Sequence, residues 1–191
     1  SFPTRRSSDL KILTVSNSEK VKDNDRFVIF RGRYPVVASN VVLKKIEDIA
    51  QKIADGFGLV NAPLLIQLLN NGDDVSVLEF CARTGGNMKW LLIKYSCGVD
   101  VITATIDITL GKIPNLEIRD TENKVVVNDF IYCFPGVFDH FEGFDEMVEK
   151  GLINEFHPVR IRGTEMILES VRVVDVNGND IMRRDLVTEL I

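Results

Sequence analysis

The chain has 191 residues, of which 45% are hydrophobic and 27% charged, so it is long enough for one large or two small domains. Its 28 acidic and 23 basic residues give a net charge of −5, which argues against a nucleic-acid-binding surface. The sequence shows no bilayer-length apolar run and no signal peptide, and its three cysteines lack close metal-type spacing. We therefore expect a cytoplasmic protein with reduced thiols that binds neither nucleic acid nor membranes.

The first ten residues, SFPTRRSSDL, have no apolar periodicity and match, letter for letter, one reading frame of a common sequencing adapter. We interpret residues 1–10 as a non-native artefact and begin the fold near Lys11. On this interpretation the chain is an N-terminally truncated fragment.

Strands are predicted at residues 11–15 and 26–31, with a charged loop between them, and Tyr34-Pro35 breaks the second strand. Ser39 is a suitable cap for a helix that extends to about Phe57, because apolar residues follow it at three- and four-residue spacing. The charged residues of this helix are interpreted as its solvated face.

A hairpin is predicted next. The apolar run at residues 63–69 contains one polar residue, Gln67, and the polar turn NNGDD leads into a second apolar run at residues 75–81. This order is typical of two antiparallel strands joined by a short loop.

The register of the hairpin decides which side chains meet. If residues 72–74 form the loop, Asn71 pairs with Val75, and Gln67 lies opposite Glu79 with the Cβ atoms about 5 Å apart. A one-residue slip would place Leu78 opposite Gln67 and turn Glu79 to the other face. With the first register, four further side chains share the face of Gln67 and Glu79: Leu65, Leu69, Val77 and Cys81.

The second strand continues into the stretch VLEFCARTGG, which places Glu79, Cys81 and Arg83 before Gly85 and Gly86. A carboxylate suits Mg²⁺, a guanidinium pairs with phosphate oxygens, and glycines let backbone N–H groups approach an anion. Taken singly, each of these features is common in a solvated strand, a surface ion pair or a turn. Together they indicate a site for a metal-bound phosphate.

Two helices are predicted after the glycines, at residues 88–95 and from Asp100 to Leu110, with Gly98 and Gly111 as their stops. Lys89 is expected to be a solvated helix lysine rather than a phosphate ligand. The apolar residues of these helices are expected in the core: Leu91, Leu92, Val101, Ile102, Ile106 and Ile108.

A smaller second domain is predicted after residue 113. Strands are expected at residues 124–134, 153–162 and 164–176, a turn at Pro135-Gly136, and a short helix at residues 144–150.

Three stretches of the sequence resemble those of the ATP-grasp superfamily: EFCARTGG, PGVFDHFEGF and VDVNGNDIMR. The resemblance covers nearly all of residues 11–191 and is nearest to bacterial carbamoyl-phosphate-synthetase-like and L-amino-acid-ligase-like ligases. It implies an α+β fold in which residues 11–113 form the C-terminal part of an ATP-grasp domain, an antiparallel sheet with backing helices. Residues 114–191 would form a small α/β C-terminal domain, shortened near residues 169–171.

The resemblance also implies roles for individual residues. Gln67 and Glu79 would be ligands of Mg²⁺ or Mn²⁺, Arg83 would steady the transferred phosphate, and Gly85 and Gly86 would form the phosphate-binding loop. Cys81 would be a third metal contact, but it stands where the family has Asn, and a neutral thiol suits Mg²⁺ poorly.

The implied reaction joins a small carboxylate to an amine through an acyl phosphate, with ATP and Mg²⁺ as cofactors. The nucleotide-gripping lysines and glycine-rich flap of such ligases would lie upstream of Lys11, so we expect this chain alone to bind nucleotide weakly and turn over none. Two alternatives remain: a noncatalytic nucleotide-binding or interaction domain, and an α+β scaffold with accidental similarity. The sequence does not determine the substrates or the oligomeric state.

Overall fold

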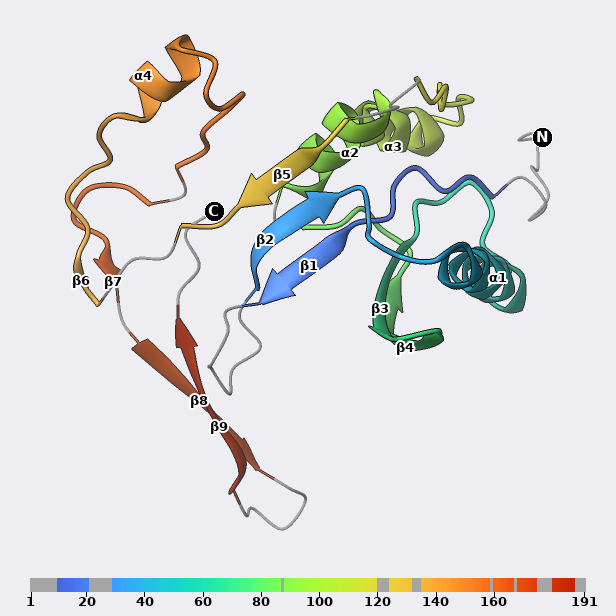
Figure 1. Cartoon of the computed structure of the whole chain (residues 1–191), viewed down its shortest axis with the longest axis horizontal. Coiled ribbons are helices and arrows are strands. Elements are labelled where there is room, and N and C mark those ends of the chain that lie inside the picture. Colours follow the sequence, from blue (N-terminus) through green and yellow to red (C-terminus); the bar gives the residue numbers. More distant parts are fainter. Residues whose placement is uncertain are drawn as a thin grey trace. The chain divides into compact units, whose positions relative to one another are not determined.

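The computed structural model describes residues 10–20, 29–86, 88–119, 124–131, 135–158, 160–166, 168–174 and 180–187 (Figure 1). Residues 1–9, most of the segment interpreted as an adapter artefact, lie outside this part, as does Cys133. The chain divides into two compact units, Ser1–Ser18 with Gly32–Asn128, and Glu19–Arg31 with Asp129–Ile191. The expected domain boundary after residue 113 stays a prediction.

The fold is α+β, as expected, and its strands form several small sheets. One sheet has the strand order β1-β2-β5, and three further pairs are β3-β4, β6-β7 and β8-β9. The bounds of the first sheet's strands are Asn17–Lys20 for β1, Ile29–Tyr34 for β2 and Val126–Asp129 for β5.

The first predicted strand is wrong, because residues 11–15 are not in a strand and β1 begins at Asn17. Val15 makes one backbone hydrogen bond, accepting from the N–H of Val36 at 3.2 Å, which is not a strand ladder. The second strand is confirmed with later bounds, and residues 26–28 lie outside the described part. It ends at Tyr34, which precedes a cis bond to Pro35.

Helix α1 (Asn40–Gly56) confirms the predicted cap and period. The side-chain oxygen of Ser39 accepts from the backbone N–H of Val42 at 3.2 Å, which satisfies one free donor of the first turn. The buried side chains are Val42, Ala50 and Ala54, which lie eight and four residues apart and therefore share one helix face.

Strands β3 (Leu65–Asn71) and β4 (Asp74–Cys81) form the predicted hairpin, and α1 packs against β4. The rings of Phe57, at the end of α1, and Phe80 meet edge to face with centroids 4.9 Å apart. Asp73 in the turn accepts from the Ser39 hydroxyl on its carboxylate at 3.1 Å and from the Lys45 ammonium on its carbonyl at 2.6 Å. Helix α1 therefore holds both ends of the hairpin.

Helices α2 (Lys89–Cys97) and α3 (Val101–Thr109) contact each other. Gly98, in the left-handed region at φ +78°, ends α2, and Asp100 caps α3, as predicted. Leu91, Leu92 and Val101 are buried as expected. The expectation for Ile102 and Ile106 is wrong: 41% and 54% of their surfaces are exposed, because α3 buries the face of Val101 and Ala104 instead.

In the second unit, β6 (Gly136–Val137) pairs antiparallel with β7 (Glu165–Met166), and helix α4 spans Phe144–Glu149. An aromatic cluster packs around this helix, with ring centroids 3.9 to 5.8 Å apart: Phe138, Phe141, Phe144 and Phe156. The helix confirms its prediction. Of the turn expected at Pro135-Gly136, Pro135 lies in a bend, whereas Gly136 already pairs in β6.

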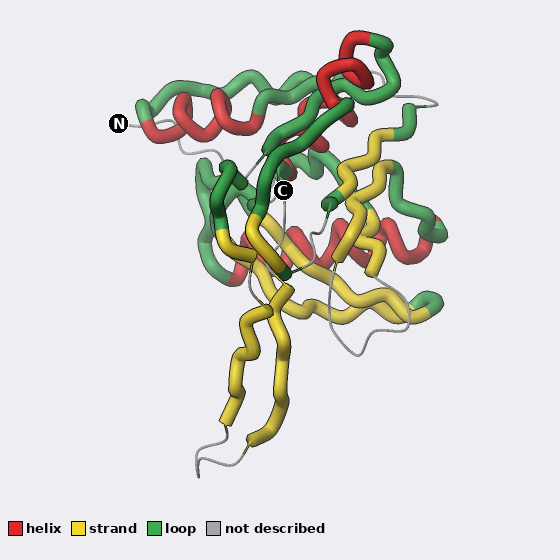
Figure 2. The backbone as a smooth tube through the Cα atoms, turned by 90° about the vertical axis from the view of Figure 1, so that its left-hand side faces the viewer, coloured by secondary structure: helices red, strands yellow, loops and turns green. Residues whose placement is uncertain are grey.

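The predicted strand at residues 153–162 is also wrong, since its described residues form turns and irregular structure. Within the strand predicted at 164–176, the described residues form β7 and β8 (Leu168–Val174), and residue 167 lies outside the described part. Figure 2 shows β8 beside β9 (Asp180–Val187), its antiparallel partner. Residues 169–171 lie within β8, and a missing unit there stays a prediction.

Candidate functional site

The hairpin places Gln67 directly opposite Glu79, as the first register predicts. Both side chains are exposed. Paired residues of neighbouring strands point to the same side of a sheet, so an amide oxygen and a carboxylate share one face.

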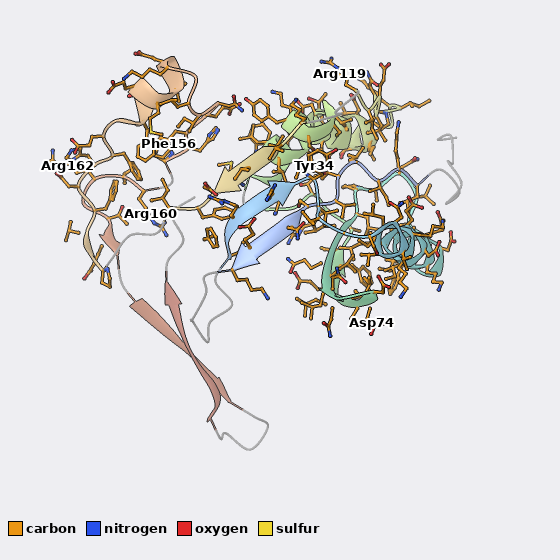
Figure 3. The ribbon with its side chains drawn as sticks, in the orientation of Figure 1. Tyr34, Asp74, Arg119, Phe156, Arg160 and Arg162 are labelled. Carbon is orange, nitrogen blue, oxygen red and sulfur yellow. The ribbon has the colours of Figure 1, made fainter. Side chains whose placement is uncertain are left out.

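The turn that produces this pairing differs from the prediction. Asn71 pairs with Asp74 rather than Val75, so the loop has two residues, Gly72 and Asp73. Gly72 has φ +63°, a left-handed conformation that suits glycine and that two-residue hairpin turns require. In Figure 3, Asp74 marks the start of β4 beside this turn.

A β-bulge reconciles the short turn with the observed pairing. Leu68 pairs with Val77 and Gln67 with Glu79, so Leu78 is an extra residue on β4. Without the bulge, the two-residue turn would place Leu78 opposite Gln67 and turn Glu79 away.

The bulge also changes one predicted neighbour of the site. Leu65 pairs with Cys81 and lies on the face of Gln67 and Glu79, as expected. Val77 is opposite Leu68 and therefore lies on the other face, which corrects the expectation that it joins Gln67. Phe80, which contacts Phe57, also lies on that other face, so α1 packs on the side of the hairpin away from Glu79.

Beyond β4 the chain bends tightly, with the N–H of Arg83 donating to the carbonyl of Cys81 at 2.9 Å. The Arg83 guanidinium is exposed and donates to the carbonyl of Thr84 at 2.7 Å. In the described part of the chain it forms no ion pair, so its remaining N–H groups can bind an anion.

The loop that contains Gly85 and Gly86, the glycine loop, folds back onto the face of the hairpin that carries Gln67 and Glu79. A Cβ atom built on Gly85 would lie 3.6 Å from Cδ1 of Leu65, the neighbour of Gln67 on that face. Gly86 accepts on its carbonyl from the N–H of Lys89 at 3.1 Å, and a Cβ atom on Gly86 would meet open space. The structure thus brings Gln67, Glu79 and the loop to one side of the hairpin.

Lys89 differs from its prediction as a solvated lysine. Its side chain is half-buried, and this burial lowers the pKa of the ammonium. The Nζ atom lies beside Gly32 of β2, 3.2 Å from the position of a Cβ atom built there. Sequence reasoning missed this neighbour, although an isolated glycine within a strand often marks a close approach of another group.

Among the described residues, no three side chains of His, Cys, Asp or Glu gather as a metal cluster. Gln67 and Glu79 instead provide two kinds of hard oxygen donor, an amide oxygen and a carboxylate. Cys81 is exposed as a free thiol on the same face, and Cys97 is free and buried. Of the helices that the structure describes, none combines the length and apolar character needed to cross a bilayer.

No protein-family model matches the chain, and no curated protein matches it. Solved structures do match, and the likeness shows that the chain has an α+β fold like part of the ATP-grasp fold. One of them is phosphoribosylglycinamide synthetase from Anaerococcus prevotii, which superposes with a TM-score of 0.59 at 14% sequence identity. The match covers 93% of this chain and 42% of that chain, so the chain spans less than half the length of that enzyme.

Proposed function

We propose that the chain forms the metal and phosphate end of an ATP-dependent carboxylate–amine ligase. The observation that carries the proposal is the bulged hairpin, which puts Gln67 and Glu79 on the face where Gly85 approaches Leu65. The likeness in fold to an ATP-grasp ligase supports the same class of activity.

The donor set fits Mg²⁺ or Mn²⁺. One carboxylate and one amide oxygen, both exposed, leave room for the waters and phosphate oxygens that Mg²⁺ keeps in its octahedral shell. A bound ion would supply positive charge to offset the charge on the phosphate oxygens. We assign the contacts to Gln67 and Glu79, and exclude Cys81 because its thiol is a soft ligand.

The other residues act on the phosphate. Arg83 would hold the transferred phosphoryl group through paired hydrogen bonds, and the backbone of Gly85 and Gly86 would approach it closely. In the proposed reaction the substrate carboxylate attacks the γ-phosphorus of ATP, which releases ADP and forms an acyl phosphate. An amine then attacks the acyl carbon and releases inorganic phosphate, so no side-chain nucleophile is needed.

The metal contact is tested with Glu79→Gln, which keeps the shape of the side chain and removes its charge. We expect the affinity for Mn²⁺ in the presence of ATP, measured by electron paramagnetic resonance, to fall about tenfold or more, or by at least about 1.4 kcal/mol. Asp74→Asn on the same strand, at the turn, is the matched control and should bind Mn²⁺ like the unmodified chain. Equal Mn²⁺ affinity in Glu79→Gln and Asp74→Asn would refute the proposal.

Cys81 favours a second candidate, a noncatalytic nucleotide-binding or interaction domain, because the resembling ligases have Asn at this place. The two are separated by incubating the chain, and longer versions of it, with ATP, Mg²⁺ and hydroxylamine, which traps acyl phosphates as hydroxamates. Hydroxamate formation supports the ligase. Mg²⁺-dependent nucleotide binding by every version, without hydroxamate for any carboxylate offered, favours the noncatalytic domain.

A further inference from the structure

The side chain of Lys89 runs between two glycines that are far apart in the sequence. Its Cβ and Cγ atoms lie against Gly85, in the loop just before α2, and its Nζ atom lies beside Gly32 on β2. The lysine therefore links the glycine loop to a strand more than fifty residues earlier in the chain.

Both glycines provide space rather than an unusual backbone conformation, since neither has a φ in the left-handed region. A Cβ atom on Gly85 would lie 3.0 Å from both Cβ and Cγ of Lys89, closer than nearly all real contacts allow. On Gly32, which is buried, it would lie 3.2 Å from Nζ. Larger residues at these positions would displace the lysine.

The ammonium so placed has no hydrogen bond or ion pair with any residue that the structure describes. Partial burial lowers its pKa, and no neighbouring carboxylate acts in the opposite direction. A cation that loses water without gaining an anion is destabilised, so binding an anion at this place would recover free energy.

We propose, on the basis of the proposed function, that Lys89 is a second phosphate-binding cation which, with Arg83, positions the phosphoryl group beside the glycine loop. A carboxylate, such as that of the acid substrate, is also an oxyanion that pairs with an ammonium group. We assign the phosphoryl group because the lysine stem packs on Gly85, which belongs to the loop proposed to bind phosphate.

The test follows the backbone amide resonances of Gly85 and Gly86 by ¹⁵N NMR while inorganic phosphate is added to the 191-residue chain without metal. Lys89→Met should weaken phosphate binding roughly tenfold to hundredfold, because a hydrogen bond to a charged group is lost. Lys94→Met, on an exposed position of the same helix, is the matched control and should bind like the unmodified chain. Lys89→Arg, which keeps the charge, should recover part of the affinity.

Gly32→Ala is a second variant that keeps the lysine and crowds its ammonium, and it should also weaken phosphate binding. It keeps the inference testable if Lys89→Met does not fold. Phosphate binding by Lys89→Met or Gly32→Ala within about twofold of the unmodified chain would overturn the inference. Saturation by acetate at concentrations as low as those of phosphate would overturn the phosphoryl assignment in favour of a carboxylate.

The metal-free phosphate titration and the Mn²⁺ measurement separate this inference from the proposed function. If Lys89→Met loses phosphate while Glu79→Gln keeps Mn²⁺, Lys89 binds phosphate and the ligase proposal fails. If Glu79→Gln loses Mn²⁺ while Lys89→Met keeps phosphate, the metal site stands and the role of Lys89 is refuted.

Discussion

Two side chains, Ser39 and Asp100, begin helices α1 and α3 by accepting hydrogen bonds from backbone N–H groups of the first turn. Asp100 receives two such bonds on one carboxylate oxygen, from Ile102 at 3.1 Å and Thr103 at 3.0 Å. These bonds lower the pKa of Asp100 from its ordinary value of 3.8, and the bond from Thr103 has the largest effect. The cap is therefore strongest when the carboxyl group is charged.

Replacing Asp100 with Ala should lower the free energy of unfolding by about 1 kcal/mol at pH 7, because α3 loses its cap. Since the pKa of the folded carboxyl is below that of the unfolded chain, the charged group stabilises the fold above about pH 4. That contribution is lost as the pH falls through the lowered pKa. Urea titrations of the unmodified chain and Asp100→Ala between pH 3 and 7 measure the difference, which should shrink toward acid pH.

Asp100→Asn is the control for charge. The amide oxygen of Asn still accepts from the first-turn N–H groups, so stability at pH 7 should stay within about 0.5 kcal/mol of the unmodified chain. It does not titrate, and its difference from Asp100→Ala should therefore stay constant with pH. A constant difference between the unmodified chain and Asp100→Ala would contradict the role of the charge.

At the scale of the element, the β3-β4 hairpin combines a tight turn with a bulge. Gly72 allows a two-residue loop, and the extra residue Leu78 restores the pairing of Gln67 with Glu79. The turn is also bound to α1 through Asp73. The position of the candidate metal ligands thus depends on the conformation of the turn as well as on their own strands.

Gly72→Ala should destabilise the chain by about 1 kcal/mol, because an alanine at φ +63° is strained by its Cβ atom. Gly56→Ala is the matched control, and its effect on stability should have the opposite sign. Gly56 ends α1 in helical conformation with open space around its Cβ position, so alanine should stabilise the chain by roughly 0.5 kcal/mol. Denaturant titrations of both variants test the pair, and equal effects would contradict the role of the turn.

On the scale of the whole molecule, each of the two units has its own hydrophobic packing. The first buries aliphatic side chains of α1, α2 and α3, and the second packs four phenylalanines around α4. Phe156, labelled in Figure 3, stacks on Phe144 with centroids 3.9 Å apart and meets Phe141 edge to face at 4.9 Å. All of these ring contacts lie within the second unit.

Phe156→Ala should therefore lower local stability by about 2 kcal/mol, somewhat less than for a fully buried ring. Hydrogen exchange followed by mass spectrometry should show faster exchange in residues 138–158 and unchanged exchange in α1 and α2. Phe57→Ala, which removes the contact with Phe80 in the first unit, should produce the reverse pattern. Equal acceleration throughout the chain in both variants would show that the units unfold together.

Local rules accounted for the features that lie within a few neighbouring residues. The caps of α1 and α3, the stop at Gly98 and the strand end before Pro35 depend on groups close in sequence, and all were predictable. The strand at residues 11–15 was wrong, because strand pairing depends on a distant partner that a propensity pattern does not contain.

By itself, the sequence determined the helices and the hairpin, offered the pairing of Gln67 with Glu79 as one of two registers, and carried the resemblance that names the candidate residues. Only the tertiary structure decided how that pairing arises, through a two-residue turn and a bulge at Leu78, and where the glycine loop and Lys89 lie. The contact between Lys89 and Gly32 joins α2 to β2. Such contacts depend on the packing of the whole unit, whereas caps, turns and the apolar periodicity of helices depend on residues close in sequence.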